Sequence, residues 1–356
     1  MDLQQQPRQA PVHPGAVSGA LLVLAASVLW GTTGTAATFA PDAGPLAIGA
    51  VAMGVGGLLQ ALTALRPMGR ARLQLQGQWK LVLLGAVAVA VYPLAFYSSM
   101  HLAGVAVGAV VSIGSAPLAS ALIERAFDRH RLSVRWVGAA LLGLSGTALL
   151  CFAAAQGGGH SAGTAGDAAG GTLAGIGLGL LAGLTYALYS WAAHRIIGGG
   201  VPARAAMGAM FGAGGLLLMP VLLATGAPLL ASWGNAAVGA YMALVPMFAG
   251  YVLFGLGLAR VRASTATTLS LAEPVVAAVL AVLVVGERLP LQGWIGIMLV
   301  IASLAVLTIP GRRRRVKTDA GVPAAKGSGG GAPFTSASSD GAGSGAGSGA
   351  GSPGGS

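Results

Sequence analysis

Stretches of about 20 apolar residues recur along the chain, separated by short breaks of proline, glycine and charged residues. An α-helix rises about 1.5 Å per residue, so a run of this length can cross a hydrocarbon core that is roughly 30 Å thick. The pattern therefore predicts an all-α polytopic membrane protein. Its ten transmembrane helices are expected at 17–38, 44–65, 79–99, 103–125, 133–153, 171–195, 204–225, 236–258, 263–285 and 291–309.

Composition supports this interpretation, because charged residues make up 8% of the chain and apolar residues 55%. A typical soluble protein carries roughly 25% charged residues, so a water-soluble fold of this size would lack polar surface. The net charge of +11 does not indicate a nucleic-acid partner, since the basic residues lie in short clusters between apolar runs. The single cysteine, Cys151, and the absence of a Cys/His ligand spacing predict neither a metal site nor a cofactor.

The basic residues predict the orientation of the chain, because Lys and Arg favour the cytoplasmic side of short loops. If the N-terminus lies inside, all but one of the 20 lysines and arginines face the cytoplasm, the exception being Arg288. We therefore expect a protein of the cell (inner) membrane with both termini in the cytoplasm. Residues 1–16 form an N-terminal tail, 154–170 a glycine-rich external loop, and 310–356 a basic, then Gly/Ser-rich tail that is expected to be disordered.

The ten predicted helices fall into two similar halves, 17–153 and 171–309. The stretch GALLVLAASVLWGTTGT from Gly19 matches GIGLGLLAGLTYALYSW in the sixth run, and a stretch ending at Pro117 matches one ending at Pro274. Each half has an odd number of helices, so the second enters the membrane inverted relative to the first. Inverted five-helix repeats are typical of transporters, because exchanging the conformations of the halves opens a central cavity to either side.

Two motifs carry a resemblance to a known family: LLVLAASVLWGTTGT at Leu21–Thr35 and LAEPVVAAVLAVLVVGERLPLQGWIGIMLVIASL at Leu271–Leu304. The sequence resembles the EamA branch of the drug/metabolite transporter superfamily over residues 17–309. The resemblance implies a ten-helix carrier of the inner membrane, usually an exporter, with a central cavity between its halves. It leaves the substrate open among amino acids, other metabolites and toxic compounds. The first half departs from the family pattern, with Ala116-Pro117 in place of a Glu-Pro pair.

Glu273 is the strongest candidate for a functional residue, because it lies near the middle of the ninth apolar run. A charged carboxylate at that depth is costly unless it faces water, a cation or donors, so we expect it to face the interior. Pro274 and Pro117 are expected helix irregularities, since proline removes a helical hydrogen bond. Glu273 is interpreted as a proton-coupling or substrate-amine site; the alternative is a protonated carboxyl that ties two helices together.

Further aromatic and hydroxyl side chains are predicted to line the same cavity: Trp30, Thr33, Tyr97, Tyr186 and Ser270. The first two belong to a Thr/Gly-rich segment of the first helix, for which tight helix packing is the alternative interpretation. Ser270 lies about one turn before Glu273 and can share its face. Glu124 and Asp128 lie among arginines, where ion pairing at the cytoplasmic boundary is the expected role.

The predicted function is a secondary transporter that exports amino acids or related compounds by alternating access, with proton coupling as one interpretation. A multidrug or toxic-amine efflux carrier and a passive metabolite channel are the alternatives. The chain has no phosphate-cradling loop ending in Lys and Ser or Thr, and no paired catalytic residues, so we predict neither an ATP-driven pump nor an enzyme. The glycine spacing at Gly175, Gly179 and Gly183 is expected to pack helices within the chain, with a homodimer as the alternative.

Overall fold

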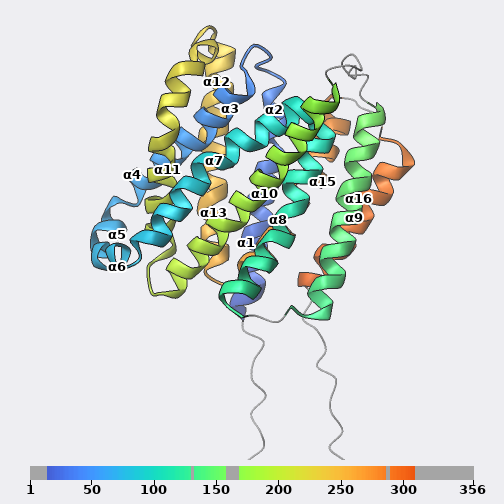
Figure 1. Cartoon of the computed structure of the whole chain (residues 1–356). Coiled ribbons are helices and arrows are strands. Elements are labelled where there is room, and N and C mark those ends of the chain that lie inside the picture. Colours follow the sequence, from blue (N-terminus) through green and yellow to red (C-terminus); the bar gives the residue numbers. More distant parts are fainter. Residues whose placement is uncertain (1–13, 130–131, 158–167, 286–288, 309–356) are drawn as a thin grey trace, which may run out of the picture. The chain divides into compact units, whose positions relative to one another are not determined.

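The computed structural model describes residues 14–129, 132–157, 168–285 and 289–308, and all regular elements in these residues are helical (Figure 1). Ten helical stretches in the described part of the chain are long and apolar enough to cross a membrane. The predicted all-α polytopic fold is therefore confirmed.

The first five spans contain these helices: α1 (Pro14–Gly31) with α2 (Thr33–Ala37); α3 (Pro45–Gly49), η1 (Ala50–Val55) and α4 (Gly56–Thr63); α7 (Trp79–Ala103); α8 (Val105–Phe127); and α9 (Val134–Gly157). Two short helices, α5 (Leu65–Arg70) and α6 (Arg72–Gly77), connect the second span to the third. The element η1 is a π-helical turn within the second span.

The second five spans follow the same order of crossings: α10 (Ala168–Gly198); α11 (Ala203–Thr225); α12 (Trp233–Met242), η3 (Ala243–Ala249) and α13 (Gly250–Leu258); α14 (Ala263–Leu269), α15 (Ala272–Leu280) and η4 (Ala281–Val285); and α16 (Leu291–Thr308). A 3₁₀ turn, η2 (Ala227–Leu230), precedes α12, while η3 and η4 are π-helical. With five spans in each half, corresponding helices run in opposite directions, as α1 and α10 do in Figure 1.

Turns between spans are set by local chemistry. Gly104 has a positive φ of 85°, a conformation that L side chains rarely adopt, and it separates α7 from α8. Ser232 caps the N-terminus of α12, because its hydroxyl accepts a hydrogen bond from the Asn235 N–H at 3.1 Å. These residues therefore end one span and begin the next without a long loop.

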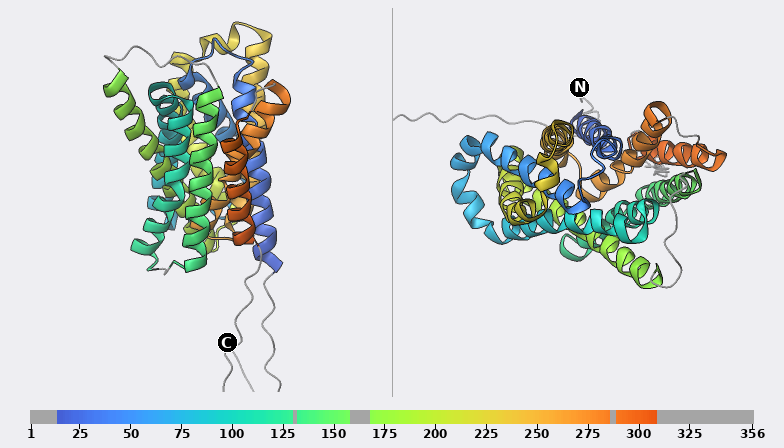
Figure 2. Two further views of the ribbon diagram at one scale, coloured as in Figure 1. Left: turned by 90° about the vertical axis from the view of Figure 1, so that its right-hand side faces the viewer. Right: turned by 90° about the horizontal axis from the view of Figure 1, so that it is seen from above.

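The two halves pack against each other along whole helices. α10 lies along α7 and α8, and α16 lies along α9 (Figures 1 and 2). A Cβ added at Gly175 would lie 2.6 Å from the Ala103 nitrogen, and one at Gly179 would lie 2.9 Å from the Ser99 hydroxyl. The regularly spaced glycines Gly175 and Gly179 of α10 thus pack against α7 of the same chain.

The predicted bounds of the N-terminal tail and of the 154–170 loop differ from the structure by a few residues. α9 extends to Gly157 and α10 begins at Ala168, so helix continues into both ends of the predicted 154–170 loop. α1 begins at Pro14, inside the predicted 1–16 tail. The middle of that loop, most of the N-terminal tail and the whole 310–356 tail lie outside the described residues.

Candidate functional site

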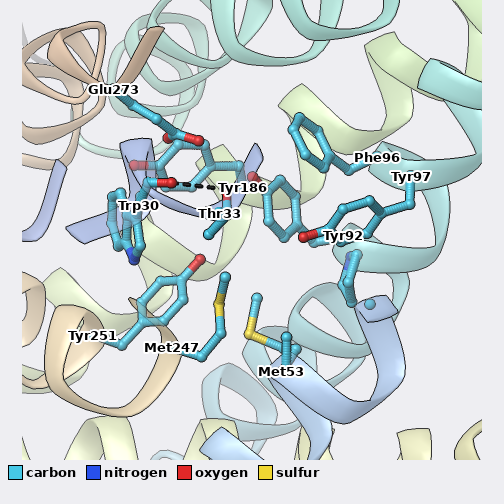
Figure 3. Close-up of a pocket in the computed structure, with 13 residues that line it drawn as sticks. Trp30, Thr33, Met53, Tyr92, Phe96, Tyr97, Tyr186, Met247, Tyr251 and Glu273 are labelled. Atoms are coloured by element: carbon cyan, nitrogen blue, oxygen red, sulfur yellow. Dashed lines mark hydrogen bonds between the residues drawn. The ribbon is translucent and has the colours of Figure 1, made fainter. Parts of the chain in front are cut away.

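A hollow between the two halves, which we call the central pocket, contains about 440 Å³ of empty space when its open side is counted. Its centre has room only for water-sized groups, so the pocket is narrow in this conformation. Small-molecule sites are mostly apolar with a few placed polar groups, which is the character of this lining. The lining residues are Trp30, Thr33, Gly49, Ala52, Met53, Tyr92, Pro93, Phe96, Tyr97, Tyr186, Met247, Tyr251 and Glu273 (Figure 3).

Trp30 and Thr33 reach the pocket where the first span is interrupted, between the end of α1 and the start of α2. The Thr33 hydroxyl donates to the Trp30 carbonyl at 2.7 Å (Figure 3). The Trp30 indole N–H donates to the Pro246 carbonyl at 3.0 Å. Pro246 belongs to η3 in the second half, so this hydrogen bond joins the two halves beside the pocket.

Gly31 brings the first span directly against the ninth. A Cβ at Gly31 would lie 2.6 Å from Cβ of Val276 and 2.9 Å from the Glu273 carbonyl oxygen. Separations of this size are too short for real Cβ atoms, so a side chain here would push α1 away from α15. The absence of a side chain at Gly31 therefore helps to set the position of Glu273.

The ninth span is interrupted immediately before Pro274, where α14 ends at Leu269 and α15 begins at Ala272. Pro274 has no N–H to offer the Ser270 carbonyl, which accepts instead from the Glu273 N–H at 2.9 Å. This tighter turn precedes the residue that carries the pocket carboxyl. The other predicted irregularity differs, because α8 continues through Pro117 as one helix.

Glu273 is the one acidic side chain in the described lining, and its carboxyl group points into the pocket (Figure 3). The carboxyl group makes no hydrogen bond in the described part of the chain. The lining that the structure describes also lacks Lys, Arg and His. A carboxyl group in these surroundings needs a proton, water or a cation as its partner. The pocket is therefore suited to hold a positively charged group.

Aromatic residues make up half of the remaining lining. The ring centroids of Trp30 and Tyr251 are 4.8 Å apart, and those of Tyr92 and Tyr186 are 5.6 Å apart. The Tyr186 hydroxyl is buried and interacts with the Ser270 side chain, but it makes no hydrogen bond of normal geometry among the described residues. Such a hydroxyl can serve a ligand that enters the pocket, because a buried donor without a partner is costly.

Most of the candidates predicted from the sequence come together in this lining: Glu273, Trp30, Thr33, Tyr97 and Tyr186. Ser270 lies outside the described lining; it is fully buried, and its hydroxyl donates to the Thr267 carbonyl at 2.8 Å. The predicted site omitted Phe96 and Tyr251. Tyr92 and Phe96 are four residues apart on α7 and their rings stack, a spacing that could have indicated a shared face. Tyr251 lies in an apolar run with no such signal.

Large buried side chains fill one end of the pocket. The hydroxyls of Tyr189 and Tyr251 form a hydrogen bond of 2.8 Å. Phe254 lies about one turn beyond Tyr251 on α13, and Phe211 of α11 packs against the Tyr251 ring at a centroid distance of 4.5 Å. Both phenylalanines are fully buried. The pocket is therefore closed toward the end at which α10 and α13 finish.

Polar contacts between the halves lie at this same end. Glu124 does not pair with an arginine in the described residues; its two carboxylate oxygens accept hydrogen bonds from the backbone N–H and the hydroxyl of Ser264, at 2.9 and 2.7 Å. This differs from the prediction, because folding brings the free N–H of α14 against Glu124. Asp128 does form the expected ion pair, with Arg195, and also accepts from the Trp191 indole at 2.9 Å.

Comparison with known proteins shows what this chain is similar to. The model of the EamA-like transporter family matches it twice, at residues 17–152 and 173–309, which correspond to the two five-span halves. A relative from Bacillus subtilis (strain 168), named "Uncharacterized transporter YwfM", is 34% identical over 296 residues, which are 83% of this chain and 95% of the relative. A protein of known crystal structure has the same fold, with a TM-score of 0.64 at 22% identity, over 81% of this chain and 96% of that one.

Proposed function

Because this chain belongs to the EamA-like transporter family, we propose that it is a secondary transporter that exports amino acids or related small metabolites by alternating access. The observation that carries the proposal is the unpaired carboxyl group of Glu273 in an aromatic pocket between two inverted repeats. A family of transporters also agrees with the expectation that the protein is not an enzyme.

The chemistry of the lining favours a substrate that carries an ammonium group. A carboxylate provides the charge partner for an ammonium, and the faces of Trp30 and of the tyrosines attract cations within about 6 Å of the ring centroid. The buried hydroxyl of Tyr186 can donate to a substrate carboxylate. An amino acid presents both groups on one small molecule.

Proton coupling follows from the same carboxyl group. In the proposed cycle, the Glu273 carboxylate pairs with the substrate ammonium on one side of the membrane. After the substrate leaves on the other side, the carboxylate takes up a proton and carries it back. Because one carboxyl group binds either a proton or the substrate, the entry of protons is linked to the exit of substrate, and a proton gradient can drive export.

The closed end of the pocket is consistent with alternating access. Tyr189, Tyr251 and Phe254 fill one end, whereas the pocket retains an open side. Inverted repeats allow the opposite arrangement when the two halves exchange conformations. We place the protein in the cell membrane with both termini in the cytoplasm, so the closed end with Arg195, Arg204 and Arg260 faces the cytoplasm.

A lipophilic amine is the second candidate substrate, favoured by the number of aromatic rings in the lining. Proteoliposomes with an acidic interior test both candidates against a passive channel. A proton-coupled carrier should accumulate labelled amino acids or labelled quaternary ammonium compounds above the external concentration, and a protonophore should abolish this accumulation. The amine probe is quaternary because a neutral amine would be trapped in an acidic interior without a carrier. A channel would only equilibrate the label, and that result would overturn the proposal.

A further inference from the structure

A second hollow lies apart from the central pocket, where α4 ends and α11 begins, with Val252 of α13 at its side. It contains about 240 Å³ of empty space, counting its open side. Met207 and Val252 provide apolar walls, while Gln60, Thr63 and Arg204 provide the polar groups. None of these residues lines the central pocket.

Gln60 is the unusual member of this group. Its side chain is 3% exposed, and its amide nitrogen has no hydrogen-bond partner among the described residues. α4 and α11 pack very closely here: a Cβ added at Gly208 would lie 2.5 Å from Cβ of Ala64. A buried amide donor without an acceptor is costly, so its presence beside a hollow indicates a missing acceptor.

Arg204 lies at the exposed side of the same hollow. One of its terminal nitrogens donates to the Thr63 carbonyl, at 3.1 Å, at the end of α4. A guanidinium group has five N–H donors, so several remain for a ligand. The Thr63 hydroxyl already donates within α4, to the Leu59 carbonyl at 3.0 Å. The part of this lining that the structure describes contains no acidic side chain.

The surroundings add positive charge and membrane contact. Arg66 and Arg70 are exposed on α5, which follows α4 and packs against α11. Leu65 and Leu73, on α5 and α6, are 58% and 72% exposed. Short helices with exposed leucines and arginines are typical of segments that lie at a bilayer surface.

From these observations we propose that the hollow between α4, α11 and α13 binds a phosphate group, held by the Arg204 guanidinium and the Gln60 amide. The phosphate of an anionic phospholipid is one source, with its glycerol portion against Met207 and Val252. A free phosphate ion presents the same chemistry. The proposal is independent of the substrate and coupling proposed above, and its test needs no transport.

Native mass spectrometry of the purified full chain in detergent can count bound phosphatidylglycerol, with phosphatidylcholine for comparison and thermal unfolding in inorganic phosphate as a separate arm. Arg204→Gln and Gln60→Met should each weaken phosphatidylglycerol binding roughly tenfold, the loss that accompanies one charge-assisted hydrogen bond. Arg260→Gln is the matched control, because Arg260 is also exposed and also donates to a helix carbonyl, that of Leu256 at 3.0 Å.

Weaker phosphatidylglycerol binding in the two site variants, with no change in Arg260→Gln, would support a lipid site. Protection by inorganic phosphate that is lost in the same two variants would support the site and assign it to free phosphate. Equal lipid binding and equal phosphate response in all variants would overturn the proposal, and so would an equal loss in Arg260→Gln. Should Gln60→Met fail to insert, Arg204→Lys must retain more binding than Arg204→Gln, because it keeps the charge; otherwise the proposal fails.

Discussion

Glu124 holds Ser264 through both of its carboxylate oxygens, one bonded to the backbone N–H at 2.9 Å and the other to the hydroxyl at 2.7 Å. Glu124 belongs to the fourth span and Ser264 to the ninth, so this pair joins the two repeats at the closed end of the central pocket. Alternating access requires the closed end to open. These hydrogen bonds then have to break.

Glu124→Ala should therefore favour the state that is open at this end. A hydrogen bond to a charged group contributes about 1.5–3 kcal/mol, so losing two shifts the equilibrium strongly. The measurement is maleimide labelling of Ser270→Cys, a fully buried position, in a Cys151→Ala background. Labelling should be faster with Glu124→Ala than without it. The exposed acid Asp42 supplies the control, since Asp42→Asn should leave the rate unchanged. Equal rates in all three proteins would show that the hydrogen bonds between Glu124 and Ser264 do not hold this end closed.

Glu273→Gln should abolish or strongly impair transport while the protein still inserts into the membrane. Glutamine has nearly the same shape, but it can neither release a proton nor pair with an ammonium. Uptake into proteoliposomes, measured at several pH values, is the test, with Asp42→Asn as the control for loss of an acid. Any residual activity should not vary with pH. Full activity across the pH range would show that Glu273 does not couple protons or bind the substrate amine.

Gly31→Ala should destabilise the protein by about 1–3 kcal/mol and impair transport, because the added methyl group meets Val276 and the Glu273 backbone. Gly34→Ala is a matched control three residues away, since a Cβ at Gly34 meets nothing within 4 Å. Thermal unfolding in detergent and transport by the same preparations would compare the two. If both variants lose the same stability, the contact with the ninth span does not explain the effect, since alanine has a higher helix propensity than glycine and should not by itself destabilise a helix.

The order and number of the spans could be predicted because hydrophobic length and proline, glycine and charge breaks are local signals. Glu273 could also be predicted as a functional residue from the sequence, since a carboxyl group in an apolar run is rare. The interruption of the first span at Gly31 and Thr32 was harder to predict, because threonine and glycine also fit tight helix packing. The structure places this interruption beside the pocket.

The contacts between the halves could not be predicted, because they join residues far apart in the sequence. Tyr251 looks like any aromatic residue in an apolar span until Tyr189 and Trp30 are packed against it. Glu124 lies near arginines in the sequence, but in the folded chain its carboxylate accepts a hydrogen bond from the backbone N–H of Ser264 at the start of α14. Local charge gave a reasonable expectation here, and tertiary packing overrode it.

Reporter fusions would test the proposed orientation. A fusion after Arg72 should report a cytoplasmic location, because the loop with Arg66, Arg70 and Arg72 follows the second span. A fusion after Gly163, between the fifth and sixth spans, should report an external location. The two fusions control for each other, since one must be active wherever the other is silent. The reverse result would contradict the cytoplasmic termini, while leaving the inversion of the two repeats intact.

Trp30→Phe should destabilise the protein by about 1–3 kcal/mol, because it removes the N–H that bonds to the buried Pro246 carbonyl and leaves that carbonyl without this donor. The ring contact with Tyr251 is largely kept, so the loss should reflect the hydrogen bond between the halves. Trp79→Phe is the matched control, since Trp79 is 57% exposed. Thermal unfolding of both variants in detergent is the measurement. If Trp79→Phe lowers stability as much as Trp30→Phe, the bond to Pro246 is not what joins the first span to the second repeat.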